Sequence, residues 1–257
     1  MKNLLKYQSI FLAVLASVAA ILVWLSVPAG SWGGKLWAVG ASVCHQIPSH
    51  SFIYENLQFP LCARCTGLYL GSMIGLLYFI TQGKKKAVPD RGYRYMLLVF
   101  FIAWAGDGSN SFINDLMNRT ILYETSNVSR LITGFGMGLV MSTALMTLFN
   151  IVIWQESKNV PLLHHIGQVI AYASVSLTIG WFLINTSFLL FQGLSVASIL
   201  TVLVVITMLY TVFWVIILKK ENSFSSIQHL SPLIVIGLAT ALVQVMLLNW
   251  LRGLILS

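Results

Sequence analysis

SVASILTVLVVITMLYTVFWVIILKK, residues 195–220, contains no charged side chain before Lys219 and Lys220. A helix needs about 20 predominantly apolar residues to cross the hydrocarbon core of a bilayer. The stretch meets that length and ends in two lysines, which favour the membrane surface. It therefore predicts a membrane-spanning helix, and similar runs recur along the chain.

The composition assigns the whole chain to the same class. Of its 257 residues, 58% are apolar and only 9% are charged, and the mean hydropathy is +0.85. Water-soluble globular domains of this length do not reach such values. The formal net charge of +8 could suggest a nucleic-acid partner, but the cations lie mainly in short loops between apolar runs, where membrane topology explains them. We expect a polytopic membrane protein that binds no nucleic acid.

Apolar runs predict an all-α transmembrane bundle of about seven spans, near residues 8–28, 66–82, 95–113, 130–153, 166–190, 195–218 and 231–251. The first run also resembles a signal peptide, because lysines precede it and small residues follow it at 27–30. Its length favours a first span that is retained.

The distribution of Lys and Arg predicts the orientation. With the N-terminus in the cytoplasm, the inner side holds Lys2, Lys6, Lys84, Lys85, Lys86, Arg91, Arg94, Lys158, Lys219 and Lys220. The outer side or its interface keeps only Lys35, Arg64, Arg119, Arg130 and Arg252. The C-terminus is then outside, and the loop between the first two spans is extracytoplasmic.

That loop leads into CHQIPSHSFIYENLQFPLCARCTGLYLG, residues 44–71, which holds all three cysteines. Cys62 and Cys65 are three residues apart at the start of a helix, so their sulfurs can share one face. Cys44 and His45 add donors from the loop, and thiolate with imidazole is a ligand set that Zn²⁺ prefers. We therefore expect zinc as a cofactor, bound by these four residues.

The fourth ligand stays open at this stage. Neighbouring residues rarely both bind one ion, so His50 or Asp107 can replace His45, or three ligands can leave an open, catalytic position. Two other interpretations compete with the metal site. A CxxC pair with a third cysteine can form a thiol–disulfide relay, and buried cysteines can serve packing alone.

Further polar residues converge on the same membrane face. Asp107 lies near the outer end of the third expected span, and Arg130 lies at the outer start of the fourth. Ionisable groups at this depth are costly unless they are paired or line a wet cavity. They therefore indicate a functional centre, or alternatively a structural Asp107–Arg130 ion pair.

Four motifs, CHQxPxxS at 44–51, CARCTGxYxG at 62–71, AGDG at 105–108 and SNxxRLxTG at 126–134, resemble a family of predicted integral membrane proteins of prokaryotes. The family is catalogued as a domain of unknown function. The resemblance implies a multi-pass protein of a prokaryotic plasma membrane. It divides the chain into a motif-bearing membrane domain, 1–138, and additional helices of the same bundle, 139–257. The family often carries Gln after the Asp-Gly pair, where this chain has Ser109, Asn110 and Ser111, so the role of an amide there stays open.

These residues suggest roles in a site for a phosphate-bearing lipid or another small anion. Catalytic candidates are Arg64, Asp107 and Arg130. In this role the two arginines would hold the phosphate group, and the Asp107 carboxylate would transfer a proton. Candidates for hydrogen bonding to the substrate are Gln46, Ser126, Asn127 and Thr133. Zinc would act as a Lewis acid or activate water. The alternatives are a transporter or binding protein with a structural zinc site, and the redox relay.

Overall fold

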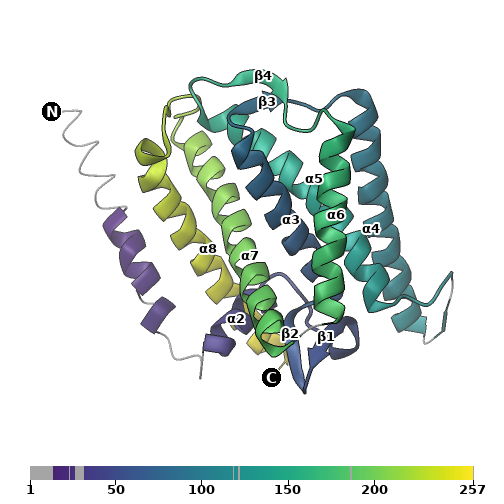
Figure 1. The fold of residues 1–257 in the computed structure, drawn as a ribbon. Helices are drawn as coiled ribbons and strands as arrows, with labels where there is room; N and C mark the ends of the chain where they lie inside the picture. The colour runs from purple at the N-terminus through teal and green to yellow at the C-terminus, as the bar shows by residue number, and fades with distance from the viewer. Residues whose placement is uncertain are drawn as a thin grey trace.

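The computed structural model describes residues 14–22, 24–26, 32–117, 119–120, 122–185 and 187–256, and its long helices stand side by side in one bundle (Figure 1). Among the described residues, six helices are long and apolar enough to cross a membrane. They are α3 (Ala63–Thr81), α4 (Arg91–Met117), α5 (Asn127–Ile153), α6 (Ile166–Ile184), α7 (Phe188–Ile217) and α8 (Ile227–Leu256). The predicted all-helical transmembrane bundle is confirmed. The expected first span, 8–28, lies partly outside the described residues, which are helical at 14–22 and 24–26.

A short β-hairpin precedes α3 at one end of the bundle, here called the hairpin end (Figure 1). It follows helix α2 (Trp32–Ala41) and the 3₁₀ turn η1 (Pro48–His50), and consists of antiparallel strands β1 (Ser51–Tyr54) and β2 (Leu57–Cys62). Glu55 and Asn56 form its turn with φ values of 45° and 70°, both positive as a type I′ turn requires. Because the strands run back along each other, Ser51 lies opposite Cys62.

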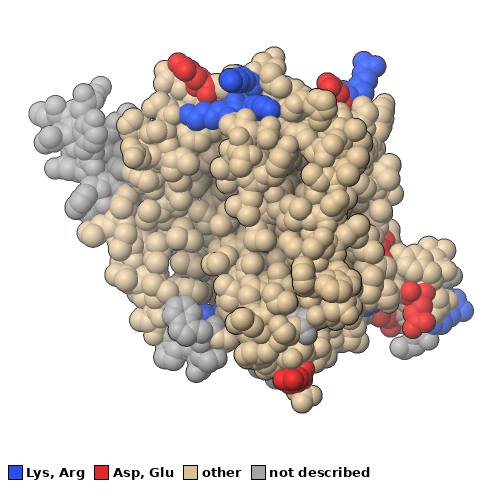
Figure 2. All heavy atoms as spheres, viewed as in Figure 1, with Lys and Arg blue, Asp and Glu red and all other residues tan. Residues whose placement is uncertain are grey.

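The opposite end of the bundle, here called the basic end, carries strands β3 (Lys85–Ala87) and β4 (Lys158–Pro161), which pair in parallel. Figure 2 shows Lys and Arg gathered at this end. The long helices therefore separate a lysine-rich surface from the hairpin end. That separation is the one expected if the basic end faces the cytoplasm, although the orientation itself stays a prediction.

Helices α3 and α5 form the centre of the bundle because glycines let their backbones touch. A Cβ atom on Gly67 would lie 2.2 Å from the carbonyl oxygen of Leu131, and one on Gly134 would lie 2.3 Å from that of Arg64. Such close approach is common where small residues meet between membrane helices. In the apolar windows of the helices, 61% of residues are buried in α5 but only 17% in α4. Helix α4 therefore lies at the rim, with most of its surface open to the bilayer.

Candidate functional site

The three cysteines meet at the start of α3. Cys44 follows α2, Cys62 ends β2, and Cys65 lies in the first turn of α3. The ligand atoms of Cys44, His45 and Cys62 all lie within 4.8 Å of one another, and the Cys65 thiol is within hydrogen-bonding reach of the other two sulfurs. All three are free cysteines. The structure shows a cluster of Cys44, His45 and Cys62, while metal binding by these three residues and Cys65 stays a prediction. The four side chains are called the cysteine cluster below.

Cys44 and Cys62 are buried, and their sulfurs are hydrogen-bonded. Cys44 is 7% exposed and Cys62 is 2% exposed. The Sγ atom of Cys44 accepts the backbone N–H of Cys62 at 3.1 Å and that of Gln46 at 3.5 Å. Hydrogen bonding from Cys44 strongly lowers the pKa of the Cys62 thiol, and the same contact raises the pKa of Cys44 to about 11. The three thiols therefore form one hydrogen-bonded group.

His45 contacts the cluster from its exposed side. Its Nδ1 accepts the backbone N–H of Ile47 at 3.0 Å, and its ring also hydrogen-bonds to Cys62. The other two candidates for a fourth ligand lie elsewhere. His50 faces Asp115, with 3.3 Å between Nε2 and Oδ2, and Asp107 faces Arg64. His45 is therefore the imidazole that the fold brings to the sulfurs.

The loop that carries Cys44 is fixed by side chains from three directions. Gln46 adopts a positive φ of 56° and donates from Nε2 to the carbonyl oxygens of Trp37 and Pro60, at 3.0 and 2.9 Å. Gln58 of β2 donates to the carbonyl oxygen of Gln46 at 2.8 Å. Arg252 of α8 donates to the carbonyl oxygens of Ala41, Cys44 and His45, at 3.3, 3.2 and 3.1 Å. Sequence reasoning did not identify Arg252 as part of the site.

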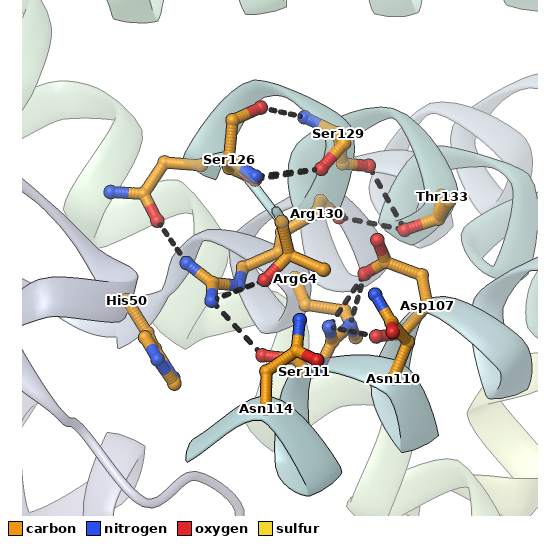
Figure 3. Close-up of polar contacts among 12 residues, drawn as sticks. His50, Arg64, Asp107, Asn110, Ser111, Asn114, Ser126, Ser129, Arg130 and Thr133 are labelled. Carbon is orange, nitrogen blue, oxygen red and sulfur yellow. Dashed lines mark hydrogen bonds and ion pairs between the residues drawn. The ribbon is translucent and has the colours of Figure 1, made fainter. Parts of the chain in front are cut away.

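Asp107 pairs with Arg64 rather than with Arg130. Arg64 donates from Nε to Oδ2 at 3.1 Å and from Nη2 to Oδ2 at 2.5 Å (Figure 3). The Tyr123 hydroxyl donates to Oδ1 at 2.8 Å. The expected Asp107–Arg130 ion pair is therefore wrong. Arg64 reaches the carboxylate of α4 from the first turn of α3, whereas the Arg130 guanidinium is engaged by neutral side-chain oxygens.

Arg130 is a buried cation whose side-chain hydrogen bonds among the described residues all go to neutral groups. It is 5% exposed and donates to the side-chain oxygens of Asn127, Ser111 and Thr125, at 3.0, 3.0 and 2.8 Å (Figure 3). Its Nε makes no hydrogen bond within the part of the chain that the structure describes. We refer to Arg64, Asp107, Tyr123 and Arg130 with these three polar partners as the polar centre.

The predicted substrate-binding residues hold the local structure together. Ser126 is the N-cap of α5 and forms a capping box with Ser129. Asn127 also donates to the carbonyl oxygen of Ser51 at 3.2 Å, which ties the polar centre to the hairpin. Thr133 donates to the carbonyl oxygen of Ser129, and Gln46 fixes the cysteine loop. Substrate binding by these four residues stays a prediction.

Comparisons with known proteins point to one family. Residues 44–144 match the model described as predicted membrane protein (DUF2085). An uncharacterized protein of Methanocaldococcus jannaschii is 31% identical over 125 residues, which are 48% of this chain and 74% of that protein. An uncharacterized protein of Methanothermobacter thermautotrophicus is 32% identical over 104 residues, which are 39% of this chain and 84% of that protein. No solved structure matches the chain.

Proposed function

The protein belongs to the DUF2085 family of predicted membrane proteins, and we propose that it is a zinc protein that recognises a phosphate-bearing lipid at the extracytoplasmic face. The observation that carries the proposal is the convergence of three free cysteines and one histidine beside a polar centre that contains two arginines. The zinc would hold the start of α3, and the arginines would receive the anion.

The donor set fits zinc on chemical grounds. Three thiolates and an imidazole match the Cys₃His composition of structural zinc sites, which are closed and four-coordinate. Backbone N–H groups already point at the Cys44 sulfur, and hydrogen bonds of this kind stabilise the thiolate form that a metal requires. The burial of Cys44 and Cys62 suits a closed site better than a catalytic one with bound water.

The charges of the polar centre favour an anionic ligand. Asp107 is the only buried acidic side chain among the described residues, whereas both Arg64 and Arg130 lie beside it. Asp107 is engaged by Arg64, so Arg130 keeps a buried positive charge without a carboxylate in contact. Buried charge near a membrane is stabilised by an opposite charge, and arginine suits phosphate because its donors are planar and fixed.

The test is metal content measured by mass spectrometry on detergent-purified protein, together with a count of free thiols. We expect about one zinc per chain and no disulfide. Cys62→Ser should lose the metal, and His45→Ala should retain it more weakly, by about 10 to 100 fold in a chelator competition. His164 lies at the basic end of the bundle, so His164→Ala is the matched histidine control and should bind zinc normally. Wild-type protein without metal would refute the zinc site.

Two other functions each have one supporting observation. The mutual contact of three free thiols supports the redox relay, which requires one disulfide and no metal in the same measurement. A reaction on the bound lipid is supported by the Tyr123–Asp107 hydrogen bond beside Arg64, since it places a phenol, a carboxylate and a cation together. That reaction requires turnover of a phosphate-bearing lipid that Asp107→Asn abolishes while zinc stays bound.

A further inference from the structure

A groove on the outward side of α4 lies next to the polar centre. Its volume is about 400 Å³, and it is lined by Arg64, Trp104, Ala105, Gly108, Ser109 and Phe112. Because α4 is largely exposed, the groove opens toward the bilayer and not into the bundle. Its one charged lining residue is Arg64, whose other edge is held by Asp107.

Two hydrogen-bond donors beside the groove have no acceptor among the described residues. Arg64 uses Nε and Nη2 for Asp107, so its Nη1 is left for the groove, where a Cβ atom on Gly108 would lie 3.6 Å from it. The indole Nε1 of Trp104 is buried and makes no hydrogen bond among the described residues. A buried donor without a partner, such as Trp104 Nε1, costs about 1 to 3 kcal/mol, so an acceptor that reaches this N–H and Arg64 Nη1 would be favourable.

The level of the groove in the membrane suits a headgroup. Helix α4 has 27 residues, whereas about 20 are enough to cross the hydrocarbon core. Its outer turns therefore reach the headgroup region, and the groove residues Gly108 to Phe112 lie within the last three turns of the helix. Phe112, at 66% exposure, and the Trp104 ring provide apolar surface next to the donors.

We propose that this groove binds the phosphate group of a membrane lipid, with Arg64 Nη1 and Trp104 Nε1 as its donors. The inference rests on the proposed function and gives it a defined binding site and a route of access, laterally from the bilayer. A cation, a neutral N–H donor and the Ser109 hydroxyl match an oxyanion, and the open apolar rim leaves room for the lipid chains to stay in the membrane.

The position of Arg64 also connects the groove to the cysteine cluster. Arg64 lies between Cys62 and Cys65 in the sequence. A metal bound by both neighbours would fix the backbone from which the Arg64 side chain reaches α4. Lipid binding in the groove should therefore weaken when zinc is removed, even though the sulfurs face the core and not the groove.

The experiment measures binding of fluorescent phosphatidic acid to detergent-purified protein of known zinc content. Diacylglycerol with the same chains and inorganic phosphate serve as comparison ligands. Trp104→Phe keeps the aromatic ring but removes the N–H, so affinity should fall about tenfold. Gly108→Leu should fill the groove and abolish binding. Gly106→Leu is the matched control, because a Cβ atom there has no neighbour within 4 Å, and it should bind like wild type.

Each outcome decides between the proposals. Equal binding of diacylglycerol, or inorganic phosphate binding as tightly as the lipid, would overturn the lipid-phosphate assignment. If neither Trp104→Phe nor Gly108→Leu changes the affinity for phosphatidic acid, the groove is not the binding site. Lipid recognition at Arg130 would then remain. Groove-dependent binding by wild-type protein that purifies without zinc would keep the groove and refute the zinc site.

Discussion

Arg252 donates from Nη1 to the carbonyl oxygen of Cys44 at 3.2 Å, although 208 residues separate them in the chain. The same guanidinium also contacts the end of α2 at Ala41. The last carbonyl groups of a helix lack partners within the helix, and a cation there is favourable. Arg252 therefore holds backbone oxygens on one side of the loop, which leaves the Cys44 sulfur facing Cys62.

Replacement of this arginine should loosen the cysteine cluster. Arg252→Gln leaves the loop carbonyls without their shared donor, and we expect zinc affinity to fall about 10 fold or more. Chelator competition measures the affinity, and the visible absorption of Co²⁺-substituted protein reports whether the coordination stays tetrahedral. Arg119→Gln removes the same charge from an exposed position at the same end and should change neither. An unchanged Arg252→Gln protein would show that the loop is held without α8.

The Arg64–Asp107 pair should be strongly coupled. The Asp107 side chain is 1% exposed and that of Arg64 is 14% exposed, so removal of one partner leaves a buried charge. Asp107→Asn is expected to cost about 3 to 5 kcal/mol of stability, while the double variant Arg64→Met with Asp107→Leu should recover much of it. Thermal unfolding in detergent measures both. If the double variant lost as much stability as its two single substitutions together, the two side chains would act independently.

The contact between α3 and α5 should not tolerate a methyl group. In Gly134→Ala the new Cβ would meet the carbonyl oxygen of Arg64 at 2.3 Å, so the helices must separate. We expect a loss of about 1 to 3 kcal/mol in unfolding free energy. Gly106→Ala, where the methyl group meets open space, is the control and should be neutral or slightly stabilising. Equal stability of the two variants would contradict the close packing.

The orientation is testable by labelling with a membrane-impermeant thiol reagent in intact cells. In a cysteine-free background, Lys158→Cys at the basic end should resist the reagent, and Ser49→Cys at the hairpin end should react. Both positions are exposed in the structure, so a difference reports the side of the membrane and not burial. The reverse pattern would place the cysteine cluster in the cytoplasm.

The sequence predicts elements with strong local signals and misses those that depend on helix placement. Apolar length identified the spans, but the run 166–190 was predicted to be one helix, whereas α6 ends at Ile184 and α7 begins at Phe188. The signal there is a short polar run from Asn185 to Ser187 without any charge. The hairpin was not foreseen, because its strands are only four and six residues long.

The same contrast holds within the candidate site. The spacing of Cys62 and Cys65 predicted their convergence, because three residues make nearly one helical turn. The partner of Asp107 could not be predicted, since Arg64 and Arg130 are both near it and only the placement of the helices in the folded bundle decides between them. Arg252 has no local signal, because its contacts are with backbone carbonyls more than 200 residues away.

The contact of Arg252 with the cysteine loop also sets an order of assembly during biosynthesis. Helix α8 follows every other element of the site in the chain, so the ribosome completes the loop, the hairpin and α3 long before it makes their last partner. Until α8 is inserted, the carbonyl groups of Cys44 and His45 lack the arginine that holds them. The cysteines therefore reach their final geometry only after insertion of α8, and stable metal loading is expected to be a late, post-translational step.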